Sequence, residues 1–143
     1  MDPFKFCLND EELLESFSSY LTKTFCLENL FFYFEVEQYE ANFSDMTPIQ
    51  NQEASRKIFE EYIMVESQLE VNVDDTIRDE IVKNLKEPII PKTIFSNAHQ
   101  EIYKLMETDS YSKWKRTKEY ARIWEKKGSP KFLSPTPSLV SLS

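Results

Sequence analysis

The sequence contains a single glycine, Gly128, in 143 residues, and this scarcity limits the folds open to the chain. Turn-rich β-sandwiches and glycine loops that hold phosphates both need backbone with φ above zero, which glycine adopts most readily. The seven prolines lie near the ends and around positions 48 and 88–91, so long stretches carry no helix breaker. We therefore predict an all-α fold.

Size and composition indicate one folded domain. A chain of 143 residues can bury a core of its own, and contents of 41% hydrophobic and 14% aromatic residues are typical of a folded protein. The residues from Gly128 onward are rich in Ser and Pro, which favours an unfolded segment. We expect a folded domain over residues 1–127 and a disordered tail over residues 128–143.

Apolar residues recur at three- and four-residue steps along most of the chain, which predicts helices. Asn9-Asp10 is expected to cap the first of them, and Asn72 a short helix with Asp74 and Asp75 in its first turn. That helix must end before Glu87-Pro88, because the residue before a proline avoids the α region. The predicted helical runs cover about residues 13–21, 26–40, 58–69, 77–85, 98–106 and 111–124.

The intervals between these runs are predicted to be loops. Residues 41–52 are polar and contain a proline, and residues 86–95 form an apolar connector with two prolines. Asp109-Ser110 is expected to interrupt the last helical region and to cap its continuation.

Residues 26–40, CLENLFFYFEVEQYE, place four aromatic residues in a row. On a helical wheel six apolar residues share an arc of roughly 220°, and we expect five of the six in the core of a helical bundle. The six are Leu30, Phe32, Tyr33, Phe34, Val36 and Tyr39. Phe31 falls between the polar residues Glu35 and Gln38, so we expect it at the surface or under a neighbouring terminal element.

Cysteine and histidine are scarce, since Cys7, Cys26 and His99 are the only ones in the sequence. A zinc site needs about four ligands at short spacing, and covalent catalysis needs a nucleophile beside a base. We therefore expect two reduced thiols, no metal, no cofactor and no catalytic residue.

The formal net charge of −8 is unevenly distributed. Acidic residues dominate positions 1–112, which argues against a nucleic-acid partner, whereas basic residues dominate positions 113–127. The basic segment is either the solvated face of a terminal helix or a peripheral contact for an anionic membrane. Because no signal peptide or membrane-spanning run occurs, we expect a cytoplasmic monomer that this segment could recruit to the inner face of the membrane.

Polar residues gather at three junctions between predicted helices. Glu28-Asn29 opens the aromatic run, Lys83-Asn84 precedes the Pro88 connector, and residues 105–111 separate the last helices. The bland interpretation makes Asn29 and Asp109 N-caps and Asn84 a C-cap. Junction residues on a rigid helical scaffold can instead form a binding surface.

Three blocks of the sequence resemble the regulator of G-protein signalling (RGS) domain family. FCLENLFFYFEVEQYE is similar to the family segment that begins F-S-E-E-N, and EVNVDDTIRDEIVKNLKEP is similar to the EVN-to-EP segment. IYKLMETDSYSKWKRTKEY resembles the segment that contains L-M-x-x-D-S-Y. The blocks follow in order at matching separations from about Phe17 to Tyr120.

The resemblance implies an RGS-type bundle of about nine helices that binds the α subunit of a heterotrimeric G protein in its GTP or transition-state form. Such a domain accelerates GTP hydrolysis by holding the switch regions of the GTPase, without catalytic residues of its own. It implies that Asn84 reaches the switch region and that Asp109 accepts hydrogen bonds from it. Matched position by position, the contact surface consists of Glu28, Asn29, Asn84, Leu105, Asp109, Ser110 and Lys113.

Two departures from the family pattern leave a second interpretation open. Lys113 stands where most members have Arg, and Cys26-Leu27 replaces a Ser-Glu pair, which removes an acid and a capping hydroxyl. The chain could therefore be an RGS-homology scaffold module that activates GTP hydrolysis weakly or not at all.

Overall fold

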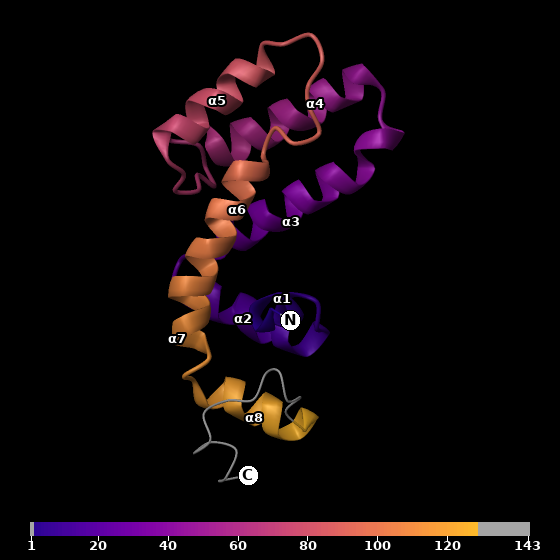
Figure 1. The fold of residues 1–143 in the computed structure, drawn as a ribbon. Coiled ribbons are helices and arrows are strands. Elements are labelled where there is room, and N and C mark those ends of the chain that lie inside the picture. The colour runs from indigo at the N-terminus through magenta and orange to yellow at the C-terminus, as the bar shows by residue number, and fades with distance from the viewer. Residues whose placement is uncertain (1, 129–143) are drawn as a thin grey trace. The chain divides into compact units, whose positions relative to one another are not determined.

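The computed structural model describes residues 2–128, and every regular element in this part of the chain is a helix (Figure 1). Eight α-helices, α1 to α8, occur together with a short 3₁₀ segment, η1, and two π-helical segments, η2 and η3. The all-α prediction is confirmed, with eight α-helices in residues 2–128 where about nine were expected. The disordered tail predicted for residues 128–143 lies, apart from Gly128, outside the described residues. None of the helices in residues 2–128 is both long enough and apolar enough to cross a membrane.

The chain divides into two compact units. The terminal unit, residues 2–25 and 107–128, contains α1 (Pro3–Leu8), α2 (Glu11–Lys23), α7 (Ser112–Trp114) and α8 (Lys118–Lys127). The central unit, residues 26–106, contains α3 (Leu27–Asn42), η1 (Phe43–Asp45), α4 (Pro48–Ile58), η2 (Phe59–Ile63), α5 (Asp75–Leu85) and α6 (Ser96–Leu105). The segment η3 (Met106–Tyr111) begins at the last residue of the central unit.

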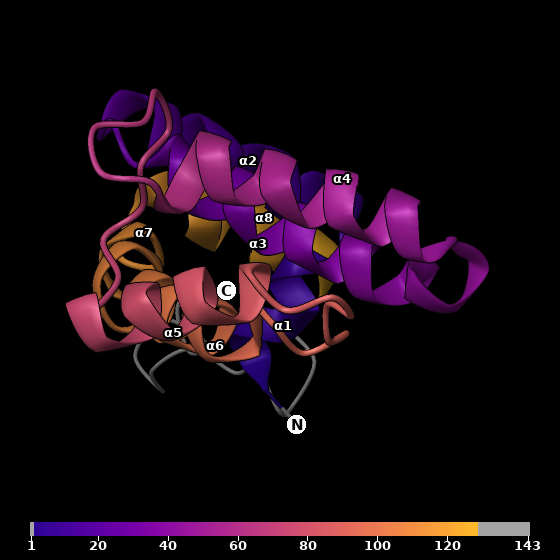
Figure 2. The same cartoon turned by 90° about the horizontal axis from the view of Figure 1, so that it is seen from above.

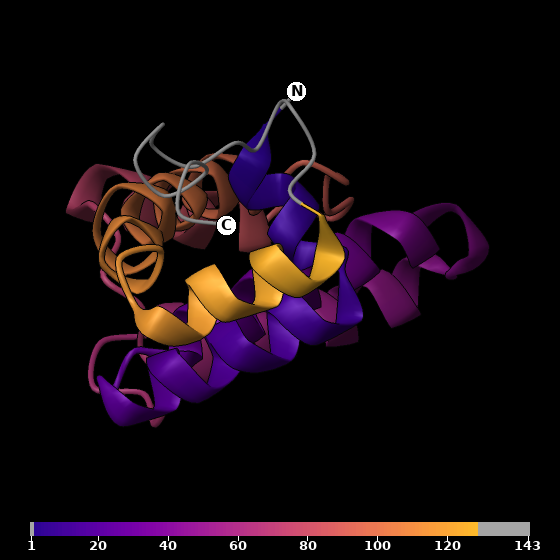
Figure 3. The same cartoon turned by 90° about the horizontal axis from the view of Figure 1, so that it is seen from below.

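Aromatic side chains form much of the core of the terminal unit. Phe4 packs edge-on against Phe17 with ring centroids 5.3 Å apart, and Trp114 packs against Tyr120 at 4.8 Å. The indole N–H of Trp114 donates to Ser16 Oγ on α2 at 3.1 Å. Helix α8 lies beside α2 (Figure 3). The short helix α7 is therefore held by both ring packing and a buried hydrogen bond.

Helix α3 is the centre of the central unit. It packs against both α4 and α6, and α5 lies against α6 (Figure 2). The ring of His99 on α6 stacks on Tyr33 of α3 with centroids 4.4 Å apart, and its Nε2 atom lies 3.1 Å from the carboxylate of Glu37. The only histidine of the sequence thus joins two helices of this unit.

The aromatic run on α3 is used mainly for the core. Five of the six arc residues are buried, as predicted, and these are Leu30, Phe32, Tyr33, Val36 and Tyr39. Phe34 is the sixth and remains 36% exposed. The surface position predicted for Phe31 is confirmed, because 45% of this residue is exposed.

The loop predicted over residues 41–52 is wrong for most of its length. Helix α3 continues to Asn42, and α4 begins at Pro48. Thr47 Oγ1 accepts a hydrogen bond from the Gln50 N–H at 3.2 Å, and Gln50 Oε1 accepts one from the Thr47 N–H at 2.9 Å. This reciprocal capping box starts a helix in a polar sequence. The proline that follows at the first helical position costs no hydrogen bond, because an N–H there would have no partner within the helix.

Two further boundaries differ from the prediction. The helical region formed by α4 and η2 ends at Ile63, so Leu69 lies beyond it. Asp74, rather than Asn72, caps α5, because Asp74 Oδ1 accepts from the Thr76 N–H at 3.0 Å. The predicted cap of α2 at Asp10 and the predicted end of α5 before Glu87 are confirmed.

Asp109-Ser110 does not interrupt the last helical region. Both residues lie inside η3, and the break falls at residues 115–117, where Thr117 Oγ1 accepts from the Tyr120 N–H at 3.2 Å and caps α8. The carboxylate of Asp109 is instead paired with Lys113 one turn further on. The interpretation of Asp109 as an N-cap is therefore wrong.

Candidate binding surface

Glu28 and Asn29 lie in the first turn of α3. The N-cap of this helix is Cys26, whose side chain makes no capping hydrogen bond, so Asn29 is not the cap. The backbone N–H of Asn29 donates to the Cys26 carbonyl at 3.2 Å, and Asn29 is buried whereas Glu28 is half-buried. Glu28 thus places a carboxylate at the positive end of the helix dipole.

Asn84 and Leu105 lie near the C-terminal ends of α5 and α6, and both are half-buried. The C-cap of α5 is Lys86, so the C-cap interpretation of Asn84 is wrong. Asn84 lines a crevice of about 180 Å³ together with Ile77 and Asn97. Asn84 is therefore partly enclosed by other residues of the central unit.

The segment between η2 and α5 carries a polar residue that the sequence analysis did not assign to the surface. The Val71 N–H donates to the carbonyl of Tyr62 at 2.9 Å, and Arg78 Nε donates to the last carbonyl of η2 at 2.9 Å. Val71 and Val73 are buried, and Asn72 between them is exposed. The sequence already carried this signal, because Val71-Asn72-Val73 in the second block places one polar residue between two apolar ones.

Asp109, Ser110 and Lys113 belong to the terminal unit. Lys113 Nζ lies 2.8 Å from Asp109 Oδ1, and the two side chains are 63% and 50% exposed. Ser110 is buried, as is Tyr111, whose ring packs 4.8 Å from that of Phe4. π-Helical segments such as η3 occur often at functional sites, because they shift side chains off the regular helical register.

Phe25, at the end of the terminal unit, is a second residue that the sequence analysis left unassigned. Its side chain is 88% exposed, and its backbone adopts a φ of 60°, which a bulky residue rarely does. Burial in the core therefore does not account for the position of this side chain. Phe25 is the first residue of the FCLEN block, and this position next to Glu28 and Asn29 could have identified it as a surface residue.

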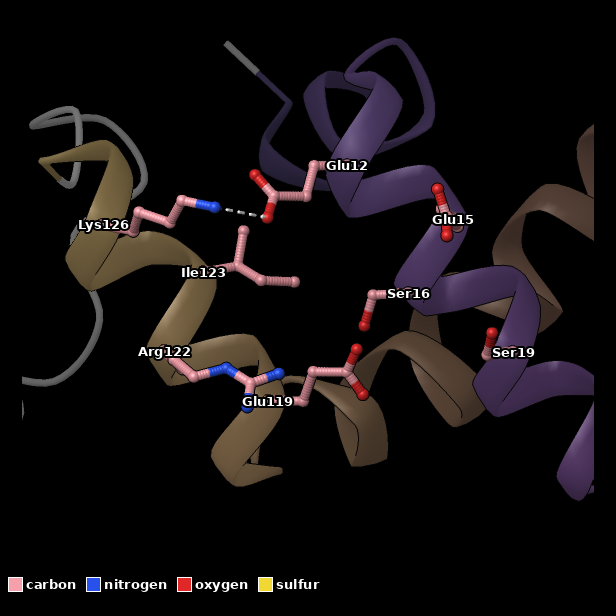
Figure 4. A pocket seen from close by; sticks show the side chains of 8 residues that line it. All are labelled: Glu12, Glu15, Ser16, Ser19, Glu119, Arg122, Ile123 and Lys126. Carbon is pink, nitrogen blue, oxygen red and sulfur yellow. Dashed lines mark hydrogen bonds and ion pairs between the residues drawn. The ribbon is translucent and has the colours of Figure 1, made fainter.

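A groove of about 450 Å³ lies between α2 and α8 in the terminal unit (Figure 4). Lys126 Nζ lies 3.3 Å from a carboxylate oxygen of Glu12, and Lys127 Nζ lies 3.2 Å from Asp10 Oδ2. Glu15, Ser19, Glu119 and Arg122 also line this groove or its rim. The basic end of α8 is thus matched by acidic residues of α2.

The structure assigns the seven predicted contact residues to two sets. Glu28, Asn29, Asn84 and Leu105 lie in the central unit, and Asp109, Ser110 and Lys113 lie in the terminal unit. Within residues 2–128 no group of His, Cys, Asp or Glu is arranged to hold a metal ion.

Comparison with known proteins identifies the class of domain. The family model of the regulator of G protein signaling domain matches residues 4–123, which include elements of both units. The chain therefore belongs to this family.

Its relatives are themselves regulators of G-protein signaling. Regulator of G-protein signaling 5 from Bos taurus is 39% identical over 107 residues, which are 75% of this chain and 56% of the relative. Regulator of G-protein signaling 8 from Homo sapiens is 33% identical over 119 residues, which are 83% of this chain and 63% of the relative. The chain thus spans less than two thirds of the length of these relatives.

Proposed function

We propose that this chain is a GTPase-activating protein for the α subunits of heterotrimeric G proteins. Membership of the family and the names of the relatives support this function. The observation that carries it is the set of polar residues at the ends of α3, α5 and η3, in the three blocks that match the family pattern.

The mechanism we propose is differential binding. A surface that contacts the switch regions more strongly in their transition-state arrangement lowers the barrier to hydrolysis without adding a reacting group. The single histidine is used for packing, because its ring is stacked on Tyr33 with centroids 4.4 Å apart. We therefore propose that the G-protein α subunit supplies all the catalytic groups.

The contact residues we propose come from both units. The central unit contributes Glu28, Asn29, Asn84 and Leu105, and the terminal unit contributes Asp109, Ser110 and Lys113. We add the exposed residues Asn72 and Phe25. Asn72 is a stronger candidate than Asn84 to reach a switch region, since its side chain is exposed while Asn84 is half-buried beside a crevice.

Single-turnover GTP hydrolysis by a panel of G-protein α subunits, with and without the domain, tests the proposal. We expect acceleration of at least one subunit, and tighter binding to the transition-state mimic than to the GDP form. No acceleration of any subunit at saturating domain would contradict the proposed function.

A scaffold module with weak or no activating activity is the second candidate. It is favoured by the N-cap of α3, where Cys26 makes no side-chain capping bond, and by Lys113, which holds Asp109 through a single ammonium. Equal binding to the transition-state mimic and the GDP form, without acceleration, would support this candidate over the first.

We also propose that residues 113–127 could recruit the protein, as a cytoplasmic monomer, to the anionic inner face of the membrane. Lys115 and Lys118 are exposed, whereas Lys126 and Lys127 are paired with acidic residues of α2. The paired end favours the solvated-face interpretation for the last turn of α8. Sedimentation with phosphatidylserine vesicles, compared with neutral vesicles, separates the two interpretations.

A further inference from the structure

The outer face of α3 forms a groove with η2 in the central unit. The groove has a volume of about 340 Å³ and is lined by Phe31, Phe34, Glu35, Gln38 and Tyr62. Phe34 and Glu35 follow Phe31 by three and four residues, and Gln38 follows Glu35 by three and Phe34 by four. The four residues from α3 therefore form one stripe along the helix. We call this feature the phenylalanine groove.

The fold does not account for the two phenylalanines of this groove. Phe31 is 45% exposed and Phe34 is 36% exposed, whereas Phe32 and Val36, on the other side of α3, are fully buried. The two neighbouring rings therefore offer apolar surface to another molecule at one side of a hollow. Removing this area from water would favour association against the entropic cost of binding.

The walls of the phenylalanine groove are fixed by the core beneath them. The ring of Phe34 meets that of Tyr33 edge-on at 5.3 Å, and the ring of Tyr62 lies 5.6 Å from that of Phe32. Both supporting residues are buried. The groove is therefore formed before a ligand arrives, which lowers the entropic cost of binding.

The charge around this groove is negative. Glu35 lines it, and no Lys, Arg or His is among its lining residues. Glu61 is the neighbour of Tyr62 on η2, and burial, followed by the carboxylates of Glu35 and Glu61, raises the pKa of Tyr62 to about 12. Such a margin repels an anionic lipid surface or an acidic peptide and attracts a cationic one.

We propose that the phenylalanine groove binds a Lys/Arg-rich amphipathic helix of a partner protein. One or two apolar side chains of that helix would lie against Phe31 and Phe34, because an apolar helix face fits a hydrophobic groove. Its cations would pair with Glu35 and Glu61, and an Arg could also stack over an exposed ring. This interaction does not depend on the G-protein function proposed above.

Selection from a phage-displayed library of helical peptides tests this inference. Wild-type protein is the bait, and the double variant Phe31→Ser/Phe34→Ser serves for counter-selection; it should remain folded, because both side chains are exposed. We expect groove-specific peptides with several Lys or Arg and an aromatic or aliphatic anchor. Recovery of acidic or uncharged peptides alone, or of none that distinguishes the two baits, would overturn the proposal.

Fluorescence anisotropy with one selected peptide then locates the contact. We expect the affinity to fall about tenfold or more in the double variant and severalfold in Glu35→Gln, with the latter loss shrinking at high salt. Ile89→Ser is the matched control, since Ile89 is 78% exposed in the same unit but does not line the groove. An equal loss in Ile89→Ser would contradict groove binding. The proposal would also be overturned if two copies of the wild-type protein paired through the groove and thereby prevented the peptide from binding.

Discussion

Lys113 Nζ lies 2.8 Å from Asp109 Oδ1, four residues earlier in the chain and across the junction of η3 and α7. Both side chains are at least half exposed. Exposed pairs of this kind contribute about 0–1 kcal/mol to stability, so this pair can matter for function with little effect on folding. Its role would be to orient the Asp109 carboxylate before a partner binds.

Replacement of Lys113 by Arg is expected to raise the potency of GTPase activation. A guanidinium can hold a carboxylate through two parallel hydrogen bonds, whereas an ammonium acts as a point charge. Dose–response curves of single-turnover hydrolysis measure the effect, and the exposed Lys118→Arg is the control for a general Lys-to-Arg change. An unchanged or lower potency in Lys113→Arg alone would rule out the orienting role.

Asn72 and Asn84 can be separated by a matched pair of alanine variants. We expect Asn72→Ala to slow activated hydrolysis by about tenfold or more with little change in melting temperature, because an exposed contact is lost. For Asn84→Ala we expect a smaller functional loss, since its amide lies beside a crevice of the central unit.

Rates and melting temperatures of both variants decide the assignment. A large functional loss in Asn84→Ala at unchanged stability, with Asn72→Ala behaving like the wild type, would return the switch-contacting role to Asn84. A large loss of stability in Asn84→Ala would instead make that residue structural.

The hydrogen bond between Trp114 and Ser16 gives a stability prediction for the terminal unit. Both residues are buried, and Ser16 Oγ accepts from the indole N–H at 3.1 Å. Ser16→Ala leaves that donor unsatisfied, which costs about 1–3 kcal/mol. Ser19→Ala on the exposed side of α2 is the control, and urea unfolding of the two variants measures the difference. Equal midpoints for both would mean that water or another acceptor satisfies the indole.

The sequence was sufficient for most of the core, because apolar spacing identified the buried residues of α3. Residue type identified the cap at Asp10. It was not sufficient where side chains decide between local alternatives. The capping box of Thr47 and Gln50 starts a helix in a stretch that was predicted to be a loop. Asp109 pairs with Lys113 within a helical region that it was predicted to interrupt.

The candidate surface was harder to derive than the core. Family blocks located the helix ends, but exposure distinguishes Asn72 from Asn84, and exposure depends on long-range contacts such as that of Val71 with Tyr62. Periodicity also placed Phe34 with its buried neighbours, although α3 presents it to the phenylalanine groove. A helical wheel gives the direction in which each side chain points around one helix, but it does not show which neighbouring elements cover that side chain.

Cys26 at the N-cap of α3 gives a prediction that links stability to function. Its side chain makes no capping bond, so Cys26→Ser supplies a hydroxyl that can accept from a free N–H of the first turn. We expect a gain of about 0.5–1 kcal/mol in unfolding free energy, and a rise in activating potency because Glu28 and Asn29 follow the cap. Cys7→Ser is the control and should destabilise, since it places a hydroxyl in a fully buried position. A Cys26→Ser protein no more stable than the wild type would mean that the first turn is already satisfied.

Buried tyrosines and Cys7 predict loss of stability at alkaline pH. Burial raises the pKa of Cys7 from 9.0 to about 12, and burial, with a smaller effect of Glu40, raises that of Tyr39 from 10.0 to about 12. In the unfolded chain these groups release their protons near the lower values, while the folded protein keeps them. Deprotonation therefore favours the unfolded state as pH rises from about 9 toward 12. The stability that these protonated groups contribute is fully present only below about pH 9.

Urea unfolding followed by circular dichroism across this pH range checks the prediction, with tyrosinate absorbance as an independent record of ionisation. We expect the urea midpoint to fall together with the appearance of tyrosinate. The decline should be shallower in Tyr39→Phe, which retains the ring but has no proton to lose. A midpoint that stays constant through pH 12 would contradict the prediction. So would tyrosinate from Tyr39, measured as the difference from Tyr39→Phe, that forms near pH 10.0 without unfolding.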